Sequence, residues 1–278
     1  DPHLKVSLAS ARTYLSNTQP LVLLDGLQLS ASAMESLIDL FPNAPVVVSA
    51  DRAGSGNAFE TIKLKPLPTE EAAQLLAAKA GIDLESVDRS IVAEICSLLA
   101  GVPLALTTTG NIVREKELSP EAVLAALKQA EVRQEDAIQA ALERSFRIAQ
   151  AVLSEAEQRM LAMAAAAPGI SASRPWLEAS SANGEIASQR LESLQLLQAN
   201  SPRLRLHPEY AAFALERFDP DALRAELMEW VLERLQIQSL DFHFLRAELG
   251  NLLGLMRWAA EKERWQDVIA LGRALDPL

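Results

Sequence analysis

The sequence predicts a mostly α-helical protein with a small α/β part near its N-terminus. Two short apolar runs, Leu21–Leu24 and Val46–Val48, flank a stretch with helical spacing. Unbroken apolar runs of this kind are typical of strands buried on both faces of a parallel sheet, and the order strand, helix, strand forms one βαβ crossover. After Leu67 the composition changes, and helices dominate to the end of the chain.

A helical hairpin in the middle of the chain organises the rest. The stretch Ala93–Val113 reads AEICSLLAGVPLALTTTGNIV, an apolar helix, a turn at Gly101 and a second apolar helix. Glycine ends the first helix, and Pro103 suits the first position of the next, where its missing N–H would be unpaired anyway. The residues alone therefore predict two packed helices, Asp88–Ala100 and Pro103–Arg114.

The composition limits the class of protein. At 278 residues the chain has room for two or more domains, and its hydrophobic content of 49% allows large buried cores. The formal net charge of −11 argues against a broad nucleic-acid surface, and an aromatic content of 5% argues against stacking platforms for single strands. The single cysteine, Cys96, is expected to be a packed thiol, which fits a reducing compartment.

No run of apolar residues approaches the ~20 that span a bilayer, and no secretory signal opens the chain. We therefore expect a cytoplasmic protein without a membrane partner. Because residue 1 is Asp rather than Met, we also expect a piece of a longer protein.

The other elements of the N-terminal part follow from spacing and turn residues. A helix is predicted within His3–Leu15, and a second helix at Ser32–Leu40 is closed by Pro42. The segment Asp51–Asn57, DRAGSGN, is a turn-rich loop. In Thr61–Leu67, TIKLKPL, apolar residues alternate with lysines, which predicts a third strand at the edge of the sheet.

Local capping signals mark the helices that follow. Thr69 is expected to cap a helix with two acidic residues in its first turn, and Ser119 to cap another that begins with Pro. Ser154 and Glu157 form a capping box for a helix through Ala166. The polar stretch 128–136, which lies between the caps at Ser119 and Ser154, is a plausible linker.

The order of elements after this linker, helices followed by a hairpin, is that of a winged helix. The predicted elements are helices at Ala137–Ile148, Ser154–Ala166, Arg174–Ala179 and Glu185–Leu197, and a strand at Leu204–Leu206. Helices are then predicted from Asp219, at Phe244–Glu261 and at Trp265–Leu275, the last two as a hairpin. One hairpin cannot bury its faces alone, since about three repeats are usually needed, so more repeats are expected beyond Leu278.

Taken in order, these pieces resemble the NB-ARC segment of bacterial members of the STAND class of signalling ATPases. The resemblance rests on the strand ending in Asp25, on GVPLAL at Gly101–Leu106, which would be the GLPLAL motif, and on LRLHP at Leu204–Pro208. It runs the whole length of the chain, but no G-x-x-x-x-G-K-[ST] phosphate-binding loop occurs in the sequence.

The resemblance implies four parts. They are a truncated parallel-sheet P-loop NTPase core at 1–67, a helical lid at 68–128, a winged-helix domain at 129–218, and a helical arm with the first tetratricopeptide-like repeat at 219–278.

By the resemblance, Asp25 is the Walker B acid, which holds Mg²⁺ through water. The family usually has a second acidic or amide residue next, and here it is Gly26. ATP hydrolysis by the longer parent would therefore be weak at best, and this chain is expected to be inactive by itself. The residues alone leave open an Asp that begins a surface turn.

Ser49 and Arg52 follow the second strand, where the family has Thr-Ser-Arg and the Arg senses the γ-phosphate. Ser49 matches the Thr, but Ala50 and Asp51 occupy the next two positions and Arg52 comes one residue late. The alternative for Arg52 is a loop arginine in solvent.

Gly101, Pro103 and His207 complete the implied nucleotide site. The resemblance places Pro103 near the adenine or the sugar, and it places His207 at the His of the MHD motif, which contacts the β-phosphate of ADP. Leu206 replaces the Met of that motif and Pro208 replaces the Asp. The alternatives are a capped helix for Pro103 and a strand-end histidine, solvated or capping the next helix, for His207.

The resemblance implies a signal-transduction switch that regulates a partner or output domain. ADP would hold the parts closed, and exchange for ATP would open them and allow homo-oligomerisation. ATP, ADP and Mg²⁺ would be cofactors of the longer parent. None should bind this chain tightly, because the phosphate-binding loop is missing. Protein partners are expected at the C-terminal helical repeats.

Two other functions stay open. One is a nucleotide-independent helical interaction module with a vestigial NTPase core. The other is a winged-helix DNA-binding regulator, whose recognition helix would be Glu185–Leu197. That helix has Arg190 as its only basic residue and two glutamates that would repel phosphates, so an intramolecular regulatory role is favoured over binding nucleic acid.

Overall fold

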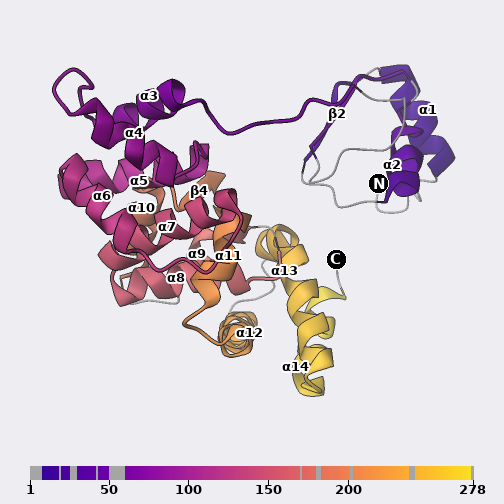
Figure 1. Cartoon of the computed structure of the whole chain (residues 1–278). Coiled ribbons are helices and arrows are strands. Elements are labelled where there is room, and N and C mark those ends of the chain that lie inside the picture. The colour runs from indigo at the N-terminus through magenta and orange to yellow at the C-terminus, as the bar shows by residue number, and fades with distance from the viewer. Residues whose placement is uncertain are drawn as a thin grey trace. The chain divides into compact units, whose positions relative to one another are not determined.

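The computed structural model describes residues 8–18, 20–25, 30–41, 43–49, 60–169, 171–179, 183–200, 203–237 and 242–276. The chain divides into two compact units, Asp1–Lys65 and Pro66–Leu278 (Figure 1). The first unit holds the small α/β part, and the second holds most of the helices.

The first unit contains one parallel pair of strands. Its elements are α1 (Leu8–Thr18), β1 (Val22–Leu24), α2 (Ala31–Ile38) and β2 (Val46–Val48). Leu23 lies opposite Val47 in a parallel register, so the predicted βαβ crossover is confirmed. Ser30 caps α2, because its hydroxyl accepts a hydrogen bond from the backbone N–H of Ala33 at 3.3 Å.

The prediction that both faces of this sheet are buried is wrong. Successive strand residues point to opposite faces, and the face that carries Leu23 and Val47 is open: their side chains are 70% and 54% exposed. The other face is half-buried. Among the residues that the structure describes, nothing covers the exposed face, so an apolar run alone did not establish burial on both sides.

The predicted third strand, Thr61–Leu67, is also wrong. The structure has no strand between Glu60 and Pro68, and Ile62 and Leu64 are 79% and 91% exposed. An alternating pattern forms a strand only where another strand accepts its backbone hydrogen bonds. No described residue pairs with this segment.

The second unit begins with four helices: α3 (Thr69–Ala80), α4 (Arg89–Leu98), α5 (Pro103–Lys116) and α6 (Pro120–Gln129). The two central helices lie where they were predicted, with Pro103 at the first position of α5. Asp88 and Ser119 cap α4 and α6 through their side chains, as polar residues at helix starts commonly do. Thr69 does not act as a cap, because α3 begins at Thr69 itself and Pro68 holds the cap position.

A small antiparallel sheet and five helices follow. The elements are α7 (Ala137–Val152), α8 (Glu155–Ala166), β3 (Ala172–Ser173), α9 (Arg174–Glu178), α10 (Gly184–Ser193), β4 (Leu197–Asn200), β5 (Arg203–Leu206) and α11 (Pro208–Leu215). The strand order is β3-β5-β4. The capping box between Ser154 and Glu157 is present as predicted. The predicted helix Glu185–Leu197 is too long, because Gln195 adopts a positive φ of 58° and Leu197 begins β4.

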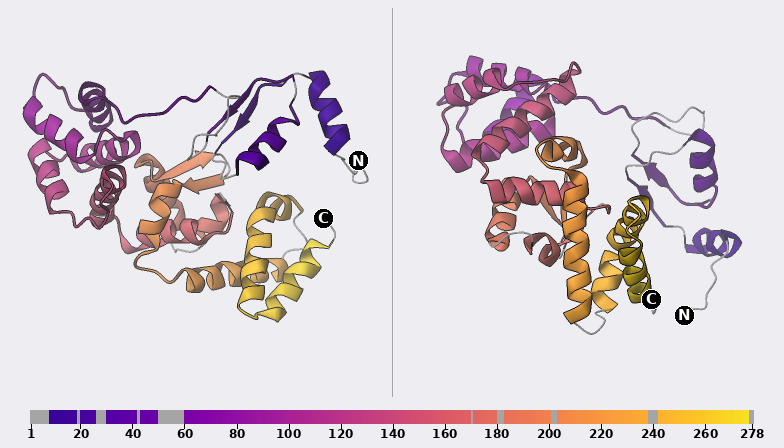
Figure 2. Two further views of the ribbon diagram at one scale, coloured as in Figure 1. Left: turned by 45° about the vertical axis from the view of Figure 1, so that its right-hand side comes forward. Right: turned by 90° about the horizontal axis from the view of Figure 1, so that it is seen from below.

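The chain ends in three helices, α12 (Pro220–Ile237), α13 (Phe242–Glu261) and α14 (Trp265–Leu275). The last two lie side by side as the predicted hairpin (Figure 2). None of the described helices is both long and apolar enough to cross a bilayer.

A continuous apolar core runs through the second unit and includes Trp176, Tyr210 and Phe146 among its largest fully buried side chains. Cys96 is a buried, free thiol, as expected, and burial raises its pKa to about 11. A thiol with so high a pKa is protonated and unreactive at neutral pH.

Candidate functional site

Two of the predicted site residues, Asp25 and Ser49, meet at the carboxyl ends of β1 and β2. The Ser49 hydroxyl donates a hydrogen bond to Oδ1 of Asp25, and the Ser49 N–H donates to the Leu24 carbonyl at 2.9 Å. Both side chains are exposed. Parallel strands place their carboxyl ends at one edge of a sheet, which is where open α/β sheets bind ligands. The two residues thus form an accessible pair of oxygen donors.

Gly26, Arg52 and the loop Ala53–Asn57 lie outside the residues that the structure describes. The role of Arg52 stays a prediction. Among the described residues, no group of three or more His, Cys, Asp or Glu side chains could hold a metal ion.

Gly101 has a packing role that accounts for its residue type. Its φ is 63°, a conformation that favours glycine, and its carbonyl accepts a hydrogen bond from the Leu67 N–H at 2.9 Å. A Cβ at this position would lie 2.2 Å from the Leu67 carbonyl oxygen. Gly101 therefore lets the α4–α5 turn close onto the chain that enters α3. Pro103, two residues on, is exposed at the start of α5.

His207 lies between β5 and α11, at the position before the first residue of the helix. Its side chain does not cap the helix, and its ring is half-buried. Nδ1 is buried and has no hydrogen-bond partner among the described residues. Burial lowers the pKa of His207. The negative charge of Glu209 acts to raise this pKa, and the positive charge of Arg205 lowers it further. The ring is therefore neutral at neutral pH. Of the alternatives for this residue, capping the next helix is wrong.

A buried cluster of hydroxyl groups lies one turn beyond His207. The Tyr210 hydroxyl donates to Oγ1 of Thr108 on α5 at 2.9 Å and lies 2.9 Å from Oγ of Ser145 on α7. All three residues are 0% exposed. No local pattern predicts this cluster, since Tyr210 and Thr108 are 102 residues apart.

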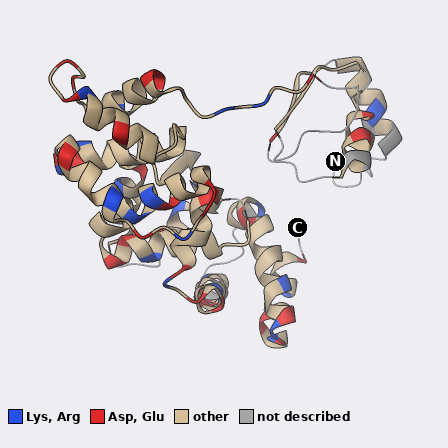
Figure 3. Cartoon of the chain, viewed as in Figure 1, with Lys and Arg blue, Asp and Glu red and all other residues tan. Residues whose placement is uncertain are grey.

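Further polar contacts join α5 to the elements around the small sheet. Asn111 donates to the Leu194 carbonyl at 3.2 Å. Arg190 on α10 bonds Glu115 at 2.7 Å and Glu157 at 2.7 Å, so it links the end of α5 to the capping box of α8. The only basic side chain of α10 is therefore engaged with carboxylates of its own chain. This pairing argues against its use on nucleic acid, as does the mixture of acidic and basic residues along the helices (Figure 3).

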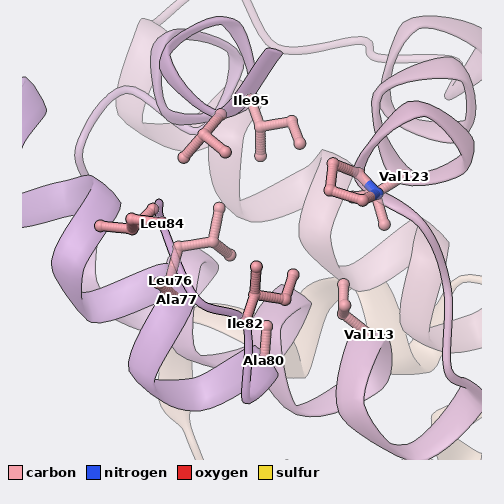
Figure 4. Close-up of a pocket in the computed structure, with 10 residues that line it drawn as sticks. Leu76, Ala77, Ala80, Ile82, Leu84, Ile95, Val113 and Val123 are labelled. Carbon is pink, nitrogen blue, oxygen red and sulfur yellow. The ribbon is translucent and has the colours of Figure 1, made fainter. Parts of the chain in front are cut away.

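Two of the hollows in the described part of the second unit are well defined, and neither is lined by a predicted site residue. One is an apolar pocket of about 10 Å³ among α3, α4, α5 and α6, where Leu76, Ile95 and Val113 point inward (Figure 4). It has room for no more than a water molecule. The other is an open depression of about 520 Å³ whose arginines Arg133, Arg147 and Arg217 lie beside two glutamates.

Comparison with known proteins shows similarity at the level of fold. No protein-family model matches the sequence, and neither does any curated protein. Among solved structures, the chain is similar to a Signal Transduction ATPase with Numerous Domains (STAND) protein with a tetratricopeptide repeat sensor from Pyrococcus horikoshii. The TM-score is 0.60 at 16% sequence identity.

This match covers 96% of the present chain and 39% of the archaeal one. The present chain therefore has a STAND-like fold, mostly helical with small sheets, and spans well under half the length of that neighbour.

Proposed function

We propose that this chain is the NB-ARC part of a STAND-type signalling switch that responds to ADP and ATP. The observation that carries the proposal is the contact between Ser49 and Asp25 at the carboxyl ends of two parallel strands. The likeness in fold to a STAND ATPase supports it. The proposed parts are a partial nucleotide-binding core at 1–67, a lid at 68–128, a winged helix at 129–218 and a helical arm with a first repeat at 219–278.

Asp25 and Ser49 fit a magnesium site to which the protein contributes few ligands. One carboxylate and one hydroxyl are hard oxygen donors, and both are open to solvent. Mg²⁺ keeps several of its waters and binds through one or two carboxylates and substrate phosphates. In our proposal, Asp25 holds the ion through water and Ser49 orients the carboxylate. Bound Mg²⁺ would neutralise phosphate charge, and Arg52 would sense the γ-phosphate.

His207 is proposed to bind the β-phosphate of ADP. Its buried Nδ1 is without a partner among the described residues, which is a state that a ligand can relieve. Pro103 is exposed at the start of α5, and with Gly101 it is proposed to lie near the adenine or the sugar. Any hydrolysis of ATP is proposed to be weak, because Gly26 follows Asp25.

The switch is proposed to act by a shift between two packings. ADP favours a closed state, and ATP favours an open one that associates with further copies and with protein partners at the helical repeats. A ligand shifts such an equilibrium only by its difference in affinity for the two states. We propose that this occurs in the cytoplasm.

The test is a calorimetric titration of Mg-ADP into the longest protein that the gene encodes around this chain. Asp25→Asn and His207→Ala should each weaken binding, by about tenfold if one charge-assisted contact is lost. Asp39→Asn and His243→Ala change exposed residues of the same types and should leave the affinity unchanged. Equal affinities in all five proteins would overturn the site. The present chain alone should show no micromolar binding of ADP or ATP.

A second candidate is a nucleotide-independent interaction module. It is favoured by the lack of a phosphate-binding loop motif in the sequence and by Trp265 and Ile269, 57% and 53% exposed one turn apart on α14. The gene upstream of Asp1 discriminates the two. An intact G-x-x-x-x-G-K-[ST] motif after a strand favours the switch, and a degenerate one favours the module.

A further inference from the structure

The Tyr210 hydroxyl is the buried polar link between the two helices that carry predicted site residues. Gly101 and Pro103 stand at the start of α5, and His207 stands directly before α11. Tyr210 on α11 reaches Thr108 on α5 at 2.9 Å, and both side chains are fully buried. Ser145 on α7 lies 2.9 Å from the same hydroxyl, so three helices meet at one oxygen atom.

The Tyr210 hydroxyl stays protonated, and the Tyr210 ring is tightly packed. Burial raises the pKa of Tyr210 to about 12, against the hydrogen bonds with Ser145 and Thr108, so its O–H is present at neutral pH. The ring packs against Phe146 at a centroid distance of 5.4 Å. A buried hydroxyl that loses its partner is destabilising, so the three oxygens hold each other in place.

His207 has no comparable anchor of its own. Its side chain makes no cap, and Nδ1 has no partner among the described residues. The first turn of α11 holds His207 in place. The Tyr210 N–H donates a hydrogen bond to the His207 carbonyl at 2.9 Å, and the ring centroids of His207 and Tyr210 are 6.3 Å apart. The position of His207 therefore depends on where Tyr210 is held.

We propose that Tyr210 is a positioning residue that, through its hydrogen bond to Thr108, fixes His207 relative to the start of α5. The coupling itself is a property of the fold, and its use in binding a nucleotide rests on the function proposed above. A shift of α5 is transmitted to His207 through one buried oxygen. This gives the lid a route to the residue proposed to contact phosphate.

Thr109 supplies a matched control. It is the neighbour of Thr108 on the same helix and is also 0% exposed, but its hydroxyl has no hydrogen-bond partner among the described residues. Replacing either threonine by Val removes one buried hydroxyl and keeps the shape. Only Thr108→Val breaks the link.

The first experiment follows the imidazole of His207 by NMR through a pH titration of this chain without any nucleotide. The charged neighbours that act on this ring are Glu209 and Arg205, and neither variant alters them. In Thr108→Val and in Tyr210→Phe, the pKa of His207 should rise toward its ordinary value by roughly 0.3 units or more. Thr108→Ser should restore it, and Thr109→Val should leave it unchanged.

If Tyr210→Phe does not fold, the threonine series decides alone. An unchanged titration of His207 in Thr108→Val overturns the proposal, as does an equal change in Thr109→Val.

The second experiment separates this proposal from the proposed function. In the longest protein of the gene, Thr108→Val should weaken Mg-ADP binding by roughly threefold or more, and it should have no further effect in a His207→Ala background. If ADP does not bind at all, the proposed function fails while the NMR result still decides the coupling. If His207→Ala weakens ADP binding, but Thr108→Val weakens it equally with and without His207→Ala, the positioning role of Tyr210 is wrong.

Discussion

Arg203 on β5 and Glu248 on α13 form a two-pronged ion pair across the junction between the small sheet and the C-terminal helices. Nη1 of Arg203 donates to Oε1 of Glu248 at 2.7 Å, and Nη2 donates to Oε2 at 3.1 Å. Glu248 is 0% exposed, and it also accepts from the Ser173 N–H and from Asn251. The helical hairpin is thus held on the sheet by a fully paired buried carboxylate.

Arg203→Ala should strongly destabilise the second unit, because it leaves Glu248 buried without its cation. Removing one partner of a buried pair typically costs about 3–5 kcal/mol. Arg205→Ala, two residues along the same strand, removes an arginine that is not part of this ion pair and should cost much less. Urea denaturation followed by circular dichroism measures both. Similar midpoints for the two variants would show that the ion pair contributes nothing particular.

Gly101→Ala should destabilise the hairpin between α4 and α5. A left-handed residue with a Cβ costs about 1–2 kcal/mol, and the added Cβ would also clash with the Leu67 carbonyl. Gly250→Ala is the matched control, since a Cβ there has open space and Ala favours a helix by about 0.8–1 kcal/mol. The melting temperature should fall in the first variant and rise in the second. A rise in both would disprove the close approach at Gly101.

Glu157 should make stability depend on pH in the acid range. Burial raises its pKa, but hydrogen bonds from Ser154 and Arg190 outweigh this and hold the pKa below the ordinary 4.5. The unfolded chain therefore binds the proton more readily. The stabilisation is complete above about pH 4.5 and is lost as the pH falls through the pKa of the folded state.

Glu157→Gln keeps a residue that can complete the capping box but removes the charge that pairs with Arg190. It should lower the free energy of unfolding at pH 7 and flatten its fall between pH 5 and 3. Glu155→Gln, an exposed change in the same turn, should leave the curve as it is. Parallel pH curves for wild type and Glu157→Gln would contradict the assignment.

The helices could be predicted from the sequence because their signals are local. Asp88, Ser119 and the pair Ser154 and Glu157 each mark a helix start within three residues of its first turn. The first sheet was predicted only in part. Its parallel pairing follows from the order of elements, but its exposed face and the unpaired segment at Thr61–Leu67 depend on what lies next to them, which no local pattern contains.

The candidate site was likewise predicted only in part. Asp25 and Ser49 were predicted as site residues from the resemblance to the NB-ARC segment, and their contact follows from the parallel strands, which bring their carboxyl ends together. The link between Tyr210 and Thr108 could not be predicted, because an isolated Tyr and Thr carry no sign of each other across 102 residues. The neutral state of His207, and the lack of a hydrogen-bond partner for its Nδ1 among the described residues, likewise depend on burial, which only the fold determines.

The most direct measurement of the central claim is the nucleotide content of the longest protein that the gene encodes around this chain. The protein is purified in its native state and denatured, and the released nucleotide is separated by anion-exchange chromatography. The account predicts stoichiometric ADP from the wild type and much less from His207→Ala, with His243→Ala like the wild type. A protein with an intact phosphate-binding loop that releases no nucleotide, or equal ADP from the wild type and His207→Ala, would contradict it.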